Sequence, residues 1–173
     1  HTRYISVTGV QTCALPISPN KTYRAVLAGT GSIADAHVRA VEATNGRVVL
    51  VAAADLDANR VREFCAKSGV PQGFTDYSTM LAEVKPDLVL IATPPKQHAA
   101  MSVAAMRAGA WVLCEKPFCG SLAELDQIEA AERETGRYTG CIFQMRFASS
   151  TAHLRALAGS GQLGKPLVRS EEH

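Results

Sequence analysis

Gly29-Thr30-Gly31-Ser32-Ile33-Ala34 directly follows an apolar run of strand length, Tyr23–Ala28, and opens a helical pattern over residues 32–44. Between a strand and a helix, the order Gly-x-Gly-x-x-Ala is typical of a turn that binds the pyrophosphate of a dinucleotide. Gly29 would make the tight turn, Gly31 would let the backbone approach the pyrophosphate, and Ala34 would permit close helix packing. The helix N-terminus would add unpaired N–H groups and partial positive charge. The alternative is a glycine-rich turn without a ligand.

An acidic residue at the end of the second apolar run favours the interpretation that the glycine turn binds a dinucleotide. Asp55 follows the run 47–54, close to where a carboxylate accepts hydrogen bonds from the adenosine ribose in dinucleotide-binding folds. A carboxylate there repels a 2′-phosphate, so we expect NAD to bind better than NADP. Arg60 and Arg62 would favour NADP, but each is more simply interpreted as a solvated charge on a helix face.

Short apolar runs alternate with helical patterns along the chain. The runs are nearly continuous and rich in Val, Leu and Ala, which is typical of strands buried on both faces of a parallel sheet. Strands are predicted over 23–28, 47–54, 87–92, 110–114 and 138–143, with a further strand beginning over 164–168. Helices are predicted over 32–44, 57–68, 77–84, 96–108 and 149–159, and between the capping box Ser121-Leu122-Ala123-Glu124 and Gly136. This alternation indicates an α/β fold with a doubly wound parallel sheet.

Two further polar segments follow predicted strands. Thr93-Pro94-Pro95-Lys96-Gln97-His98 comes after 87–92, and Glu115-Lys116-Pro117 comes after 110–114. Open α/β sheets bind ligands at the carboxyl ends of their strands. A carboxylate beside an amine in a cleft can hold the ammonium near hydroxyl groups, and a partly desolvated lysine exchanges protons readily. Taken alone, these residues have simpler interpretations. Glu115 and Lys116 would more often be a surface charge pair, and His98 would more often cap a helix. Arg146, further along the chain, would more often be a solvated charge.

Together these motifs resemble the glucose-fructose oxidoreductase/inositol dehydrogenase (Gfo/Idh/MocA) family. The resemblance covers 22–168 and includes the Glu-Lys-Pro run and Gln144-Met145-Arg146-Phe147 before a helix. It implies a two-domain NAD(P)-dependent oxidoreductase in which a Rossmann domain precedes a second α/β domain. That second domain would supply substrate contacts and usually the subunit interface. The resemblance therefore implies a sugar, inositol or related polyol as substrate and a homo-oligomeric parent protein.

The resemblance also assigns roles to individual residues. It places Gly29, Gly31, Ser32 and Ile33 along the pyrophosphate, Asp55 at the ribose, Thr93, Pro94 and His98 beside the nicotinamide half, and Glu115 and Lys116 at the nicotinamide ribose. Lys116 would also orient and polarise the substrate oxygen, which makes it the candidate catalytic residue. Arg146 would lie near the cofactor or the domain junction. No metal site is expected.

The catalytic Asp-x-x-x-His pair of that family belongs to the second domain and has no counterpart in this sequence. Asp35-Ala36-His37 is not a substitute, because it lies in the first predicted helix with a different spacing. We therefore expect the nucleotide-binding half of an oxidoreductase, inactive on its own. The alternative is an NAD-binding sensor or regulatory protein without turnover, which a missing histidine in the intact protein would favour.

Composition limits the partners. With 173 residues, 47% hydrophobic and 20% charged, the chain is one globular domain or a fragment, and not a disordered tail, fibre or coiled coil. A net charge of +2 with interspersed signs predicts neither a nucleic-acid nor a membrane partner, and no apolar run approaches the roughly 20 residues of a membrane span. Apart from Cys13, which lies in the adapter-like end described below, the cysteines are Cys65, Cys114, Cys119 and Cys141. Their spacing shows no zinc pattern and, without a secretory signal, favours reduced thiols in the cytoplasm.

The two ends resemble translated sequencing adapter. Residues 7–18 match a common short-read adapter codon by codon, and residues 169–173 can be encoded by the reverse complement of part of the same oligonucleotide. We therefore expect 1–18 and 169–173 to be non-native. The NAD(P)-binding domain would then span 19–145, and a truncated substrate domain would begin over 146–168. The alternative is a genuine N-terminal arm and acidic tail.

Overall fold

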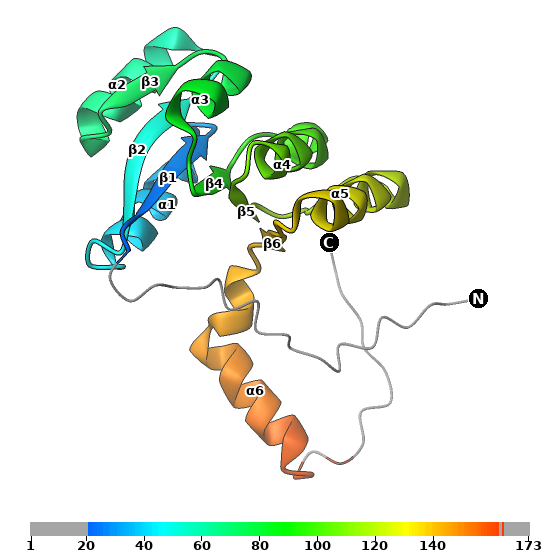
Figure 1. Ribbon diagram of the computed structural model, residues 1–173. Helices are drawn as coiled ribbons and strands as arrows, with labels where there is room; N and C mark the ends of the chain where they lie inside the picture. The colour runs from blue at the N-terminus through cyan, green and yellow to red at the C-terminus, as the bar shows by residue number, and fades with distance from the viewer. Residues whose placement is uncertain (1–20, 163, 165–173) are drawn as a thin grey trace.

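A six-stranded parallel sheet organises the computed structural model, which describes residues 21–162 and 164 (Figure 1). Its strands lie in the order β3-β2-β1-β4-β5-β6. Their bounds are β1 (Tyr23–Ala28), β2 (Val48–Ala54), β3 (Gln72–Phe74), β4 (Leu88–Ile91), β5 (Trp111–Cys114) and β6 (Thr139–Cys141). This order confirms the predicted doubly wound sheet. It also places a crevice between the carboxyl ends of β1 and β4, where the strand order reverses.

Six helices and two 3-10 turns connect the described strands or follow them. They are α1 (Ala34–Glu42), α2 (Ala58–Ser68), α3 (Tyr77–Val84), η1 (Pro95–Gln97), α4 (His98–Arg107), α5 (Leu122–Thr135), η2 (Gln144–Phe147) and α6 (Ser149–Gly159). The predicted cap of α5 is present, because the Ser121 hydroxyl accepts the Glu124 N–H at 3.2 Å. The Glu124 carboxylate reaches back to the Gly120 N–H at 2.6 Å, one residue earlier than in a standard capping box.

The core has two layers, one on each face of the sheet. Helices α3, α4 and α5 cover one face, where Met80, Met106 and Ile128 are buried against the sheet. Helices α1 and α2 cover the other face, where Ala34, Val61 and Phe64 pack. No described element covers β5 on this second face, so Leu113 is 40% exposed while its neighbours Val112 and Cys114 are buried. Burial raises the pKa of the Cys114 thiol to about 12, which fits a packing role.

The structure departs from the predicted elements at several boundaries. β3 was not predicted, because this edge strand has three residues, one of them Gly73, and so carries no apolar run. Helix α1 begins at Ala34 and not at Ser32, since the Ala34 N–H closes a turn onto the Gly31 carbonyl at 3.0 Å. The predicted helix 96–108 is divided between η1 and α4, and the strand predicted over 138–143 keeps only its centre.

Some predictions fall on residues that the structure does not describe. These are the adapter-like ends 1–18 and 169–173 and residues 165–168 of the predicted last strand. None of the described helices offers an apolar stretch of the length that a membrane span requires.

Candidate functional site

The glycine turn between β1 and α1 forms the floor of the site. Gly29 has a φ of +91°, and a Cβ built there would lie 2.6 Å from the Ala92 carbonyl oxygen. The turn therefore crosses directly over the end of β4, and only glycine fits. Gly31 differs, because nothing lies within 4 Å of the position its Cβ would take. The backbone at Gly31 is thus open to a ligand, and α1 begins beside it without a side-chain cap.

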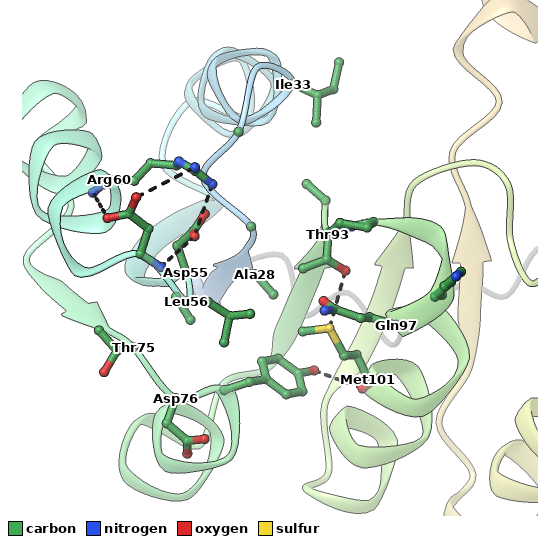
Figure 2. Close-up of a pocket in the computed structure, with 18 of the residues that line it drawn as sticks. Ala28, Ile33, Asp55, Leu56, Arg60, Thr75, Asp76, Thr93, Gln97 and Met101 are labelled. Atoms are coloured by element: carbon green, nitrogen blue, oxygen red, sulfur yellow. Dashed lines mark hydrogen bonds and ion pairs between the residues drawn. The ribbon is translucent and has the colours of Figure 1, made fainter.

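A cleft of about 900 Å³ opens from this turn along the carboxyl ends of β1, β2 and β4 (Figure 2). Its position is the crevice expected from the strand order. Seven residues that the sequence assigned to cofactor binding line it: Gly29, Gly31, Ser32, Ile33, Asp55, Thr93 and Pro94. The motifs after β1, β2 and β4 therefore meet in one cavity.

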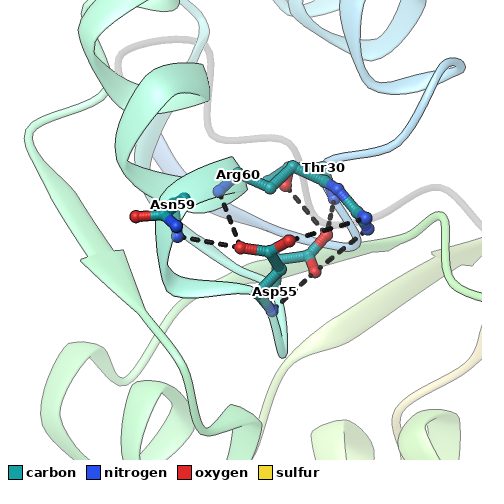
Figure 3. Close-up of polar contacts among 5 residues, drawn as sticks. Thr30, Asp55, Asn59 and Arg60 are labelled. Atoms are coloured by element: carbon teal, nitrogen blue, oxygen red, sulfur yellow. Dashed lines mark hydrogen bonds and ion pairs between the residues drawn. The ribbon is translucent and has the colours of Figure 1, made fainter.

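Asp55 lies at the end of the cleft beside β2, held by several donors (Figure 3). Its Oδ2 accepts the N–H and the hydroxyl of Thr30, both at 2.9 Å, and its Oδ1 accepts the Asp57 N–H at 3.1 Å. Burial by itself would raise the pKa of Asp55, but these hydrogen bonds and the nearby Arg60 charge outweigh it and lower the pKa below its ordinary value. The carboxylate is therefore ionised at neutral pH, as a ribose acceptor must be.

Arg60 requires a correction to the sequence interpretation. Its Nη1 lies 3.4 Å from Asp55 Oδ1, its Nη2 lies 3.8 Å from Asp57 Oδ2, and the residue lines the cleft. It is therefore not simply a solvated charge on a helix face. Arg62, by contrast, does not line the cleft and donates to Asn59 Oδ1 at 2.8 Å. Arg60 faces the cleft because it lies in the first turn of α2, and α2, capped by Asp57, begins next to Asp55.

The opposite wall of the cleft comes from α3 and α4, and the sequence analysis missed it. The Tyr77 hydroxyl donates to the Met101 carbonyl at 3.0 Å, and the Thr93 hydroxyl donates to Met101 Sδ at 3.4 Å. Burial raises the pKa of Tyr77, so its hydroxyl stays protonated. Thr75 and Asp76 follow β3 as Asp55 follows β2. Recognising β3 in the sequence would have found them.

Four predicted site residues do not line this cleft. His98 is 1% exposed, and its ring lies between two main-chain oxygens. Glu115 is also buried, and one of its carboxylate oxygens accepts the Lys116 N–H at 3.3 Å. Lys116 is exposed directly after β5, and Arg146 is exposed in η2. These two cations therefore lie on surface segments outside the cleft.

His37 is a neighbour of Glu115 that the sequence analysis did not assign. It projects from α1, is 7% exposed, and has its Nε2 3.3 Å from Glu115 Oε1 without the alignment of a hydrogen bond. Burial lowers the pKa of His37, and the nearby Glu115 opposes this shift. Asp35 instead pairs with Lys67 at 2.6 Å, so Asp35 and His37 do not act together. Nowhere in the described residues do three or more His, Cys, Asp or Glu side chains form a possible metal site.

Comparison with known proteins agrees with this geometry. Residues 23–143 match the family described as "Oxidoreductase family, NAD-binding Rossmann fold". The chain is 29% identical over 154 residues to inositol 2-dehydrogenase of Salmonella typhimurium, which covers 88% of this chain and 46% of that protein. It is 30% identical over 145 residues to D-glucoside 3-dehydrogenase of Escherichia coli, covering 84% and 41%. The chain thus spans less than half the length of these relatives.

Solved structures share the fold. The crystal structure of myo-inositol 2-dehydrogenase from Lactobacillus plantarum superposes with a TM-score of 0.77 at 29% identity, covering 84% of this chain and 43% of that one. The WlbA dehydrogenase from Bordetella pertussis, crystallised with NADH and UDP-GlcNAcA, gives a TM-score of 0.78 at 25% identity, covering 83% and 44%. The chain therefore belongs to the Gfo/Idh/MocA oxidoreductase family, and residues 23–143 are its NAD-binding Rossmann fold.

Proposed function

We propose that this chain is the cofactor half of an NAD-preferring dehydrogenase that acts on a CH–OH group of a sugar, an inositol or a related polyol. The observation that carries the proposal is the open backbone at Gly31 at one point of the cleft, with an ionised Asp55 at another. Gly31 and the α1 N-terminus would hold the pyrophosphate, and Asp55 would accept hydrogen bonds from the adenosine ribose. Thr93 and Pro94 would then flank the nicotinamide half. When bound, NAD would supply the hydride acceptor or donor.

The substrate and the remainder of the protein belong to the same proposal. Lys116, exposed after β5, would orient and polarise the substrate oxygen, while a proton-transferring histidine would come from the part of the parent protein that this chain lacks. Residues 19–145 would form the NAD domain and 146–168 the start of the substrate domain, with 1–18 and 169–173 as adapter-derived additions. The parent protein would be a cytoplasmic homo-oligomer. The names of the relatives support the substrate class.

Cofactor titration tests the proposal. Asp55→Ala should remove the preference for NAD over NADP, because it deletes a charged acceptor for the ribose diol and a charge that repels a 2′-phosphate. We expect NAD binding to weaken by about 1–3 kcal/mol, the usual value of hydrogen bonds to a charged group, and NADP binding to improve. Calorimetric titration of both cofactors measures this. Thr30→Val is the matched control, since it removes a bond to Asp55 but keeps the carboxylate. Equal affinities of the unmodified chain for NAD and NADP would contradict the assignment.

Arg60 should limit that preference. Arg60→Ala should weaken NADP binding by about 1 kcal/mol, the upper range for an exposed ion pair, and should leave NAD binding nearly unchanged. The reason is that its guanidinium lies beside Asp55, where a 2′-phosphate would approach. Arg62→Ala is the control, because Arg62 is on the same helix but outside the cleft. The expectation fails if the two variants lose NADP affinity equally.

A further inference from the structure

The cleft continues beyond Asp55 to the end of β3. The Asp55 N–H donates to the Phe74 carbonyl at 3.1 Å, and Phe74 is the last residue of β3. Thr75 and Asp76 follow it directly and line the cleft. In Figure 2 both lie on the same side of the cleft as Asp55, and Thr93 lies on the other side. The carboxylate proposed to bind the ribose therefore has these two polar residues as neighbours.

The strand order decides which part of a dinucleotide would reach Thr75 and Asp76. Gly31 follows β1, Asp55 follows β2 and Asp76 follows β3, and these strands are neighbours in the sheet. A ligand with its phosphates at Gly31 and its ribose at Asp55 would direct its base toward the end of β3. This step rests on the proposed function. Leu56, which lines the cleft and is 83% exposed, offers the base an apolar surface.

Asp76 can only accept hydrogen bonds from such a base. Its Oδ1 caps α3 by accepting the Thr79 N–H at 2.6 Å. Hydrogen bonds from the Thr79 side chain and N–H lower the pKa of Asp76 below its ordinary value, so the carboxylate is ionised at neutral pH. An ionised carboxylate offers about four lone-pair sites, so the cap leaves it able to accept from a ligand. Thr75 differs, because its hydroxyl can donate or accept and so cannot distinguish one base from another.

We propose that Asp76 is a specificity-determining residue that selects adenine by accepting a hydrogen bond from its 6-amino group. Hypoxanthine carries a carbonyl oxygen in place of that amino group, and a carbonyl oxygen only accepts. A carboxylate facing it would set two acceptors against each other and leave both without a donor. The chain therefore distinguishes NAD from nicotinamide hypoxanthine dinucleotide, which differs from NAD only in the base.

Titration of the chain with these two dinucleotides tests the proposal. The unmodified chain should bind NAD roughly fivefold more tightly, the usual effect of one hydrogen bond. Asp76→Asn should abolish this difference, because an amide can donate to the carbonyl oxygen as well as accept from the amino group. Asparagine is also a favoured N-cap residue, so α3 should keep its cap. An unchanged urea midpoint would confirm that the variant folds normally.

Asp57→Asn is the matched control, because Asp57 also lines the cleft and also caps a helix, accepting the Asn59 N–H at 2.9 Å. It removes the same charge and should keep the preference for NAD. Loss of the preference in both variants, or in neither, would overturn the role of Asp76. Equal affinities of the unmodified chain for the two dinucleotides would overturn this proposal alone. A chain that binds neither would overturn the proposed function as well.

Discussion

Alanine at position 29 should destabilise the chain far more than alanine at position 31, although both glycines belong to one turn. Gly29 adopts a φ of +91°, and a left-handed conformation costs a non-glycine residue about 1–3 kcal/mol. The added Cβ would also lie 2.6 Å from the Ala92 carbonyl oxygen and 2.9 Å from the Thr93 nitrogen. These are backbone atoms at the end of a buried strand and cannot move aside. The urea midpoint of Gly29→Ala should therefore drop sharply.

Gly31→Ala, in the same motif, should not destabilise the chain. No atom lies within 4 Å of the Cβ position and the backbone is not left-handed, so the urea midpoint should stay the same or rise slightly as the unfolded chain loses entropy. NAD affinity should nevertheless fall at least tenfold, because the methyl group occupies the approach of the pyrophosphate. Equal midpoints for the two variants would contradict the described turn. Unchanged NAD affinity in Gly31→Ala would contradict the cofactor position.

The central strands could be predicted because each carries its own signal. Residues Ala25 to Ala28 are almost completely buried, and a strand covered on both faces leaves a continuous apolar run in the sequence. β3 leaves no such run, because it is short, lies at the sheet edge and contains Gly73. Missing β3 also hid Thr75 and Asp76, whose place in the cleft follows from the end of that strand. Because β3 was not predicted, part of one wall of the site was not predicted either.

Site residues could be predicted where function depends on local spacing. The glycine turn and Asp55 follow consecutive strands, so their meeting at one edge follows from the topology. Arg60 and Met101 enter the cleft through the orientation of whole helices, which local sequence does not encode. His98 shows the same limit in the opposite direction, because the sequence placed it at the site whereas the structure buries it outside the cleft. A histidine at a helix start can face a ligand or the interior, and only the positions of the Thr93 and Pro117 carbonyls distinguish these.

Lys116→Ala should lower turnover of the full-length protein about 10²–10³-fold, the usual cost of removing one donor that stabilises negative charge developing on a substrate oxygen, with little loss of NAD affinity. The proposed full-length protein would be obtained by extending the chain along its genomic reading frame. Lys116 is exposed just after β5 and does not line the cleft, so its removal should leave most of the proposed nucleotide contacts in place while deleting the ammonium proposed to face the substrate oxygen. Turnover would be measured on a panel of inositols and aldoses with NAD, and NAD affinity by titration.

Lys96→Ala is the informative control for Lys116, because Lys96 is an exposed lysine that does line the cleft. It should raise the KM for NAD more than it lowers kcat, the reverse of the Lys116 pattern. Unchanged turnover in Lys116→Ala would reduce Lys116 to a surface charge. A full-length protein that binds NAD but oxidises no substrate in the panel would instead favour the sensor alternative. The 173-residue chain should show no turnover, since cofactor binding without the second half supplies neither a substrate wall nor a proton-transferring histidine.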